Sequence, residues 1–119
     1  MFQDKVVVIT GGIGKCIREE FEKAGAKVCI IDIADNPYFV GDIGDEATLR
    51  RFAEKVITDH GRVDCLINNA PPLFKGINEC TYEEFNYALR VGVSSAFLLT
   101  QLFMPHFAPG ASIINISSS

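Results

Sequence analysis

The sequence has no long apolar run, no cysteine pair at metal-binding spacing and no excess of basic residues. Its 119 residues carry 11 lysines and arginines against 15 aspartates and glutamates, for a formal net charge of −4. Nucleic-acid-binding surfaces are normally basic, so this balance argues against a nucleic-acid partner. No uninterrupted apolar stretch approaches the roughly 20 residues that span a bilayer, and residues 6–9 are too short a run for a signal peptide. We therefore expect a cytoplasmic protein that binds neither nucleic acid nor a membrane.

The four cysteines lie far apart in the sequence, at Cys16, Cys29, Cys65 and Cys80. None belongs to a Cys-x-x-Cys pair, so we expect no zinc or other metal site. Cys29 and Cys65 lie inside apolar runs of strand length, where reduced core thiols are the expected state. The sequence therefore does not predict a disulfide framework.

Apolar runs of strand length alternate with helical periodicities along the whole chain. Strands are expected at residues 5–10, 27–32, 38–40, 63–68 and 112–117, and helices at 14–24, 46–60 and 81–106. Gly25 and Gly61 are placed to end the first two helices, and Asp45 to cap the second at its start. Regular alternation of this kind favours right-handed crossovers and a parallel, doubly wound sheet. We predict a single α/β domain over residues 1–119.

A glycine-rich turn, Thr10-Gly11-Gly12-Ile13-Gly14, joins the first expected strand to the first helix. Glycines here permit a tight turn and let the backbone approach a pyrophosphate at the helix N-terminus. Asp32 ends the second strand about twenty residues later, where a carboxylate accepts hydrogen bonds from the adenosine ribose. It would also repel a 2′-phosphate, which favours NAD over NADP. An ordinary strand-to-helix turn and strand cap could use the same residues, and this alternative stays open.

The run Asp64-Cys65-Leu66-Ile67-Asn68-Asn69-Ala70 resembles the Asn-Asn-Ala-Gly signature of the short-chain dehydrogenases/reductases. Three further segments follow in the family's order: Gly41-Asp42, residues 97–101 and residues 113–118. The resemblance implies a Rossmann-like sheet with strand order 3-2-1-4-5. It also implies an NAD-dependent oxidoreductase, a homodimer or homotetramer, that transfers hydride between the nicotinamide cofactor and an alcohol or carbonyl substrate.

The resemblance assigns roles to individual residues at the carboxyl ends of the strands. The pyrophosphate would be lined by Gly11, Gly12, Ile13 and Gly14. Asp32 would hold the ribose and Asp42 the adenine amino group, while the cofactor cleft would be walled by Asn68, Asn69 and Ala70. The catalytic serine would be Ser118, which would hold the substrate oxygen. On the residues alone, the two asparagines could instead satisfy backbone groups at a strand end, and the serines could form a polar tail.

The chain departs from the family pattern in places that matter for chemistry. The family's glycine motif is Thr-Gly-x-x-x-Gly-x-Gly, and here it is shortened. Residues 33–37 are too few for the helix that should join the second and third strands, because a parallel crossover takes about a dozen residues. The catalytic Tyr-x-x-x-Lys pair is absent, since no tyrosine here has a lysine four residues later. Pro71 and Gly92 also stand where the family has glycine and asparagine.

These departures lead to expectations about surface and function. Residues 112–117 would form an apolar edge strand, and the long helix would expose Phe97, Leu98, Leu102 and Phe103. We therefore expect the 119 residues to belong to a longer protein. The leading hypothesis is the NAD-dependent oxidoreductase. One alternative is a non-catalytic nucleotide-binding or protein-interaction module derived from a truncated Rossmann unit, and another is a fragment without activity of its own.

Overall fold

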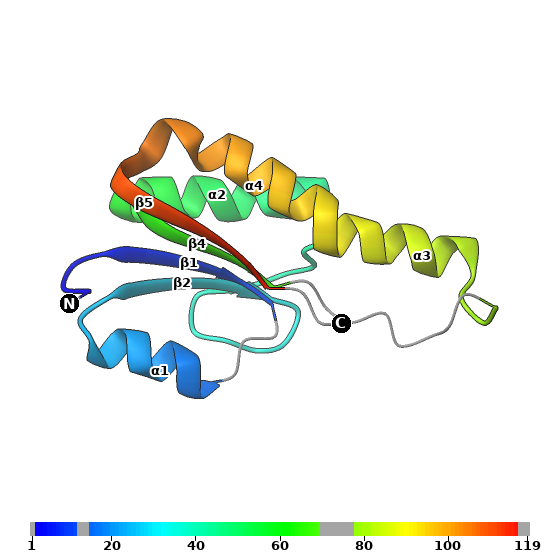
Figure 1. Ribbon diagram of the computed structural model, residues 1–119, viewed down its shortest axis with the longest axis horizontal. Helices are drawn as coiled ribbons and strands as arrows, with labels where there is room; N and C mark the ends of the chain where they lie inside the picture. Colours follow the sequence, from blue (N-terminus) through cyan, green and yellow to red (C-terminus); the bar gives the residue numbers. More distant parts are fainter. Residues whose placement is uncertain (1, 12–14, 70–77, 117–119) are drawn as a thin grey trace.

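A computed structural model describes residues 2–11, 15–69 and 78–116 (Figure 1). Five parallel strands form one sheet in the order β3-β2-β1-β4-β5. The prediction of a Rossmann-like α/β fold with strand order 3-2-1-4-5 is therefore confirmed. The strands are β1 (Val6–Thr10), β2 (Lys27–Asp32), β3 (Phe39–Val40), β4 (Val63–Asn69) and β5 (Phe107–Ile116), and the α-helices are α1 (Lys15–Lys23), α2 (Glu46–His60), α3 (Tyr82–Leu89) and α4 (Ser95–Phe103).

The central strand β1 is buried along its whole length between two hydrophobic cores. Val6 and Val8 belong to the larger core, beneath α2 and α4, whereas Val7 and Ile9 belong to the smaller core on the opposite face. Successive side chains of a strand point to opposite faces, so a strand covered on both faces needs apolar residues at every position. This explains the continuous apolar run that marked the strand in the sequence.

Helix α2 begins and ends at the predicted residues because both ends are encoded locally. The Asp45 carboxylate accepts a hydrogen bond from Thr48 N at 3.0 Å, which satisfies a free N–H of the first turn. Gly61 adopts a left-handed conformation with φ of 70°, and its N–H donates to Ile57 O at 2.8 Å. Phe52 points from the middle of this helix into the larger core and is fully buried.

The connection between β2 and β3 contains no helix, as predicted, and residues 33–38 join the two parallel strands directly. β3 is only two residues long and pairs with the last two residues of β2, so the chain returns over a very short distance. Asn36 organises the turn: its Nδ2 donates to Phe39 O at 2.9 Å, and its Oδ1 accepts from Tyr38 N and Phe39 N, both at 2.9 Å.

The long helix begins where predicted but is not a uniform α-helix. Thr81 Oγ1 accepts from Glu84 N at 3.1 Å and Glu84 Oε1 accepts from Thr81 N at 3.2 Å, which forms a capping box. A π-helical stretch, Arg90–Ser94, separates α3 from α4 and contains Gly92. A 3-10 turn, Met104–His106, follows α4. Single π-turns inside α-helices are frequent at functional sites.

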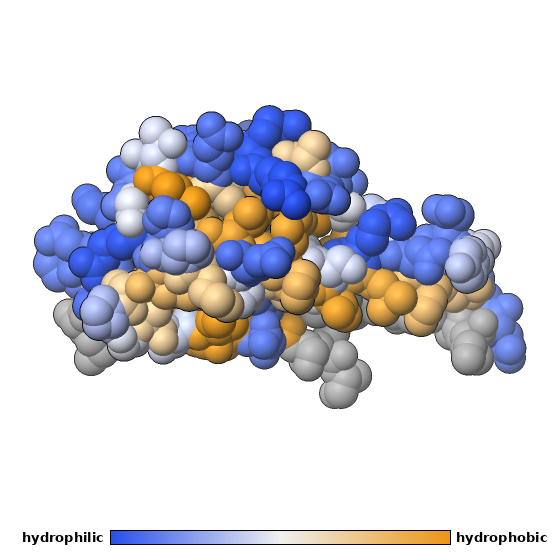
Figure 2. All heavy atoms as spheres, turned by 90° about the horizontal axis from the view of Figure 1, so that it is seen from above, coloured by the Kyte–Doolittle hydropathy of each residue, from blue (hydrophilic) through white to orange (hydrophobic). Residues whose placement is uncertain are grey.

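The expected exposure of the long helix is correct for some of its residues. Phe97 is 68% exposed, Leu98 and Leu102 are half-buried, and Phe103 is fully buried, so the prediction was wrong for Phe103. Phe103 faces Phe52 of α2 with a ring-centroid distance of 6.4 Å. Figure 2 shows that apolar side chains gather along one side of the arm that α3 forms, while polar side chains cover the other.

The helical stretch Tyr82–His106 has 25 residues and a mean hydropathy of 1.3 in its most apolar window. By length and composition alone it could cross a membrane, which differs from the expectation based on uninterrupted apolar runs. A helix in the core of a folded domain passes the same test. Leu99 and Phe103 are fully buried in the larger core, but only 22% of the apolar window is buried in the structure.

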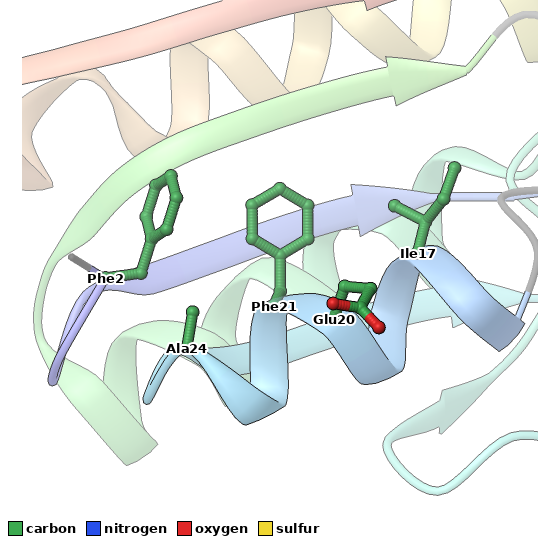
Figure 3. A pocket seen from close by; sticks show the side chains of 5 residues that line it. All are labelled: Phe2, Ile17, Glu20, Phe21 and Ala24. Carbon is green, nitrogen blue, oxygen red and sulfur yellow. The ribbon is translucent and has the colours of Figure 1, made fainter.

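Among the described residues, the face of the sheet that carries α1 and the edge formed by β5 leave apolar side chains exposed. β5 is an edge strand, as predicted, with Ile113 and Ile114 each 45% exposed, although it begins at Phe107, earlier than expected. In α1, Ile17 is 48% exposed. Its side chain and that of Phe21 line an apolar pocket on α1 together with Phe2 (Figure 3).

Candidate functional site

The carboxyl ends of four neighbouring strands bring the described candidate residues to one edge of the sheet. Thr10 pairs with Ile31 of β2 and with Asn68 of β4, and Asp32 pairs with Val40 of β3. Ligands of open α/β sheets bind in the crevice outside these carboxyl ends. The edge thus holds the predicted residues Gly11, Asp32, Asp42, Asn68 and Asn69. The other predicted site residues, Gly12, Ile13, Gly14, Ala70 and Ser118, lie outside the described residues.

Gly11 occupies a position that only glycine fits well. Its φ of 62° lies in the left-handed region, and a Cβ there would be 3.1 Å from Ile43 Cδ1. Its N–H donates to Ile31 O at 2.8 Å, which ties Gly11 to the neighbouring strand β2. Asn69 N donates to Thr10 Oγ1 at 3.1 Å and ties the end of β4 to the same turn. The backbone at Gly11 is therefore held close to the neighbouring strands with no side chain in the way.

Asp32 offers a free carboxylate oxygen at the end of β2. Its Oδ1 accepts a hydrogen bond from Ala34 N at 3.3 Å, and within the described ranges Oδ2 has no partner. The Asp32 carbonyl accepts from Gly41 N at 2.9 Å, which joins the end of β2 to the segment that leads into Asp42. An ionised carboxylate is an acceptor only, so Asp32 is suited to hydroxyl donors.

Asp42 lies in the turn between β3 and α2, and one of its oxygens accepts two hydrogen bonds. Gly44 N and Tyr87 Oη each donate to Asp42 Oδ1 at 2.8 Å. Burial, and then the hydrogen bond to Asp42, raises the pKa of Tyr87. Sequence reasoning missed Tyr87, because it lies 45 residues from Asp42 and no local pattern marks it.

Asn68 is buried, and its amide is only partly satisfied. Its Nδ2 donates to Asn115 Oδ1 of the neighbouring strand β5 at 3.0 Å, while no described residue donates to its Oδ1. A buried acceptor without a partner is unusual in a folded protein, and a bound group at such a position can supply the missing donor. Asn115 was not singled out in the sequence, although it belongs to the segment that resembles the family's fifth strand.

The resemblance seen in the sequence extends to nearly the whole chain when it is compared with known proteins. A family model described as short chain dehydrogenase matches residues 5–119. The chain belongs to the short-chain dehydrogenase family. Members of this family are oxidoreductases that use NAD or NADP.

Two solved structures and one sequence relative show how this family member compares. An uncharacterized oxidoreductase of Thermotoga maritima is 32% identical over 139 aligned positions, covering 98% of this chain and 55% of the relative. An apo SCOR enzyme from Clostridium thermocellum is 38% identical with a TM-score of 0.87, covering 98% of this chain and 55% of that one. A 3-ketoacyl-(acyl-carrier-protein) reductase from Brucella melitensis, complexed with NADH, is 30% identical with a TM-score of 0.84, covering 99% and 59%.

The chain spans about half the length of the relatives that it matches. The Thermotoga alignment is 139 positions long, more than the 119 residues of this chain, so that relative carries residues inside the matched region that this chain lacks. This agrees with the shortened glycine motif and the missing crossover helix of this family member.

Proposed function

We propose that this chain binds NAD at the carboxyl edge of its sheet, as the cofactor-binding part of an oxidoreductase for alcohol or carbonyl substrates. The observation that carries the proposal is the grouping of Gly11, Asp32 and Asp42 at this edge, where each carboxylate keeps an oxygen without a partner among the described residues. We also propose that the protein is cytoplasmic. We propose further that it forms a homodimer or homotetramer, and the exposed apolar side of α3 and α4 supports this assembly.

The residues present fit a dinucleotide in three ways. Gly11 keeps the backbone bare at the turn where a Cβ would meet Ile43. Asp32 offers a carboxylate oxygen to the hydroxyls of the adenosine ribose, and its negative charge disfavours the 2′-phosphate of NADP. The buried Asn68 Oδ1 is an acceptor that still lacks a donor among the described residues.

When bound, NAD supplies the hydride acceptor or donor at its nicotinamide ring. The chain's own residues would bind and orient this cofactor: Asp32 would hold the ribose, Asp42 would hold the adenine amino group, and the Gly11 backbone would lie nearest the pyrophosphate. Ser118 would orient the substrate oxygen. The family's tyrosine and lysine, which handle the hydroxyl proton, are absent from these 119 residues. Cofactor binding is therefore the part of the proposal that this chain can be tested for directly.

The second candidate is a nucleotide-binding module without catalysis. Both candidates require NAD binding, and they differ in turnover. Production of NADH from NAD with a panel of primary and secondary alcohols supports the oxidoreductase, whereas NAD binding without turnover over that panel supports the module.

Isothermal titration calorimetry with NAD and NADP tests the binding proposal. We expect NAD to bind at least about tenfold more tightly than NADP, because a carboxylate at the ribose repels the added phosphate. In Asp32→Ala the affinity for NAD should fall about tenfold or more, since hydrogen bonds to charged groups contribute about 1.5–3 kcal/mol. Asp35→Ala is the matched control, because Asp35 is an exposed aspartate in the loop that follows Asp32. Undetectable NAD binding, or equal effects of the two substitutions, would refute the proposal.

A further inference from the structure

Tyr87 reaches from α3 to the turn after β3, where it contacts the carboxylate proposed to hold adenine. Its Oη lies 2.8 Å from Asp42 Oδ1, and Gly44 N lies 2.8 Å from the same oxygen. In Figure 1, α3 extends beyond the carboxyl ends of the strands, and its end nearest to α4 lies closest to them. Asp42 Oδ1 is therefore occupied twice, and Oδ2 is the oxygen left without a partner among the described residues.

The ring of Tyr87 is seated in a space that depends on the glycine of this turn. A Cβ at Gly44 would lie 2.9 Å from Tyr87 Cε1, 3.2 Å from Asp42 Oδ1 and 3.3 Å from Val91 Cγ2. Real Cβ atoms do not approach ring atoms so closely, so any larger residue at position 44 would displace the phenol. Arg90 lies over the same ring, with its guanidinium carbon 5.6 Å from the ring centroid. The phenol is thus placed by contacts with both the turn and its own helix.

We propose that Tyr87 is a positioning residue that fixes the Asp42 carboxylate so that its free oxygen selects a purine with an exocyclic amino group. The proposal rests on the NAD-binding function given above. A carboxylate accepts hydrogen bonds and donates none. Adenine presents N–H donors at its exocyclic nitrogen, whereas hypoxanthine presents an oxygen there, whose lone pairs face the carboxylate unfavourably. Holding one carboxylate oxygen in place with two donors sets the direction in which the other one accepts.

The neutral state of the phenol supports this role. Burial and the hydrogen bond to Asp42 both act to raise the pKa of Tyr87, so the hydroxyl keeps its proton and remains a donor to Asp42 Oδ1. Tyr87 is 42% exposed and belongs to neither of the two hydrophobic cores. Removing its hydroxyl should therefore affect the carboxylate far more than the fold.

The test compares the affinities of the full chain for NAD and for nicotinamide hypoxanthine dinucleotide, which differ only at the base. We expect the wild-type chain to prefer NAD by about tenfold or more, the ratio that one hydrogen bond to a charged group produces. In Tyr87→Phe this ratio should fall to about threefold or less, because the carboxylate loses one of the two donors that orient it. Tyr82→Phe is the matched control in the same helix, since Tyr82 is 81% exposed.

A second variant tests the placement of the ring without removing the hydroxyl. Gly44→Ala should reduce the base preference as Tyr87→Phe does, because its Cβ displaces the phenol. The double variant should be no worse than either single variant, as expected when two substitutions remove one interaction. Thermal unfolding of Tyr87→Phe should match that of the wild-type chain.

Each result decides between the two proposals. If the wild-type chain binds neither dinucleotide, the NAD-binding function fails, and this inference fails with it. If the chain binds NAD but Tyr87→Phe keeps the full base preference, the inference alone is overturned. A loss of affinity that is equal for both dinucleotides would also overturn it, because it would indicate a general structural role for Tyr87.

Discussion

Tyr38 lies at the β3 edge of the sheet, where the helix that should join the second and third strands is missing. Its side chain packs against both hydrophobic cores, one on each face of the sheet. Its ring meets Phe52 edge-on at a centroid distance of 6.2 Å, and the Lys55 ammonium lies 4.1 Å above the ring centroid. Its hydroxyl donates to Asp59 Oδ2 at 2.7 Å. One side chain thereby connects the β2–β3 turn to α2, so we predict that Tyr38→Ala strongly destabilises the fold.

The expected magnitude follows from the burial of the ring. Truncating a fully buried aromatic residue to alanine costs about 3–5 kcal/mol, and an edge-to-face pair contributes about 0.5–1.5 kcal/mol beyond its buried area. Tyr38 is half-buried, so we expect Tyr38→Ala to lower the free energy of unfolding by about 2–3 kcal/mol. This is a large share of the roughly 5–15 kcal/mol that stabilises a typical domain. Tyr38→Phe keeps the ring and its contact with Phe52, so it should retain most of the stability.

Equilibrium unfolding in urea, followed by far-ultraviolet circular dichroism, measures this difference. The m-value should stay constant, because it reports the surface exposed on unfolding and a loss of contacts should change only the midpoint. Tyr82→Ala is the control, since Tyr82 is 81% exposed, and its effect should stay within about 0.5 kcal/mol. The reasoning is refuted if Tyr38→Ala behaves like this control. It is also refuted if Tyr38→Phe is as destabilising as Tyr38→Ala, because the hydroxyl and not the ring would then connect the turn to the helix.

Two further predictions concern the larger core. Phe52→Ala should lower the free energy of unfolding by about 3–5 kcal/mol, because the ring is fully buried among other aromatic rings. Phe97→Ala is the control, since Phe97 is 68% exposed, and it should change the free energy of unfolding by less than about 0.5 kcal/mol in the same urea assay. Burial raises the pKa of the Cys29 thiol to about 11, so the unfolded chain loses this proton at a lower pH than the folded chain. The free energy of unfolding should therefore fall as the pH rises from about 8.5 towards 11, and this fall should be smaller in Cys29→Ala, as urea unfolding at pH 8 and pH 10.5 can show.

The elements that could be predicted from the sequence are those whose limits are encoded locally. Asp45 and Gly61 bound α2 through contacts within four residues of each end, so the helix was predicted at its observed limits. β5 shows the opposite case. Pro109 and Gly110 resemble a turn, yet this strand already pairs with β4 at Phe107, through an irregular register. Edge strands tolerate proline because their outer side needs no ladder partner, so a local breaker signal misplaced the start of the strand.

The same distinction applies to the candidate site. The positions of Asp32 and Asp42 could be predicted, because each follows a strand and the strand order brings the carboxyl ends together. Which oxygen each carboxylate leaves free could not be predicted, because it depends on the groups that donate hydrogen bonds to that carboxylate. Asp32 is held by Ala34, only two residues away, whereas Asp42 is held both by Gly44, two residues away, and by Tyr87, 45 residues away on α3. A sequence pattern can therefore locate the edge where we propose that a nucleotide binds, but the contact between Tyr87 and Asp42 exists only once the chain has folded.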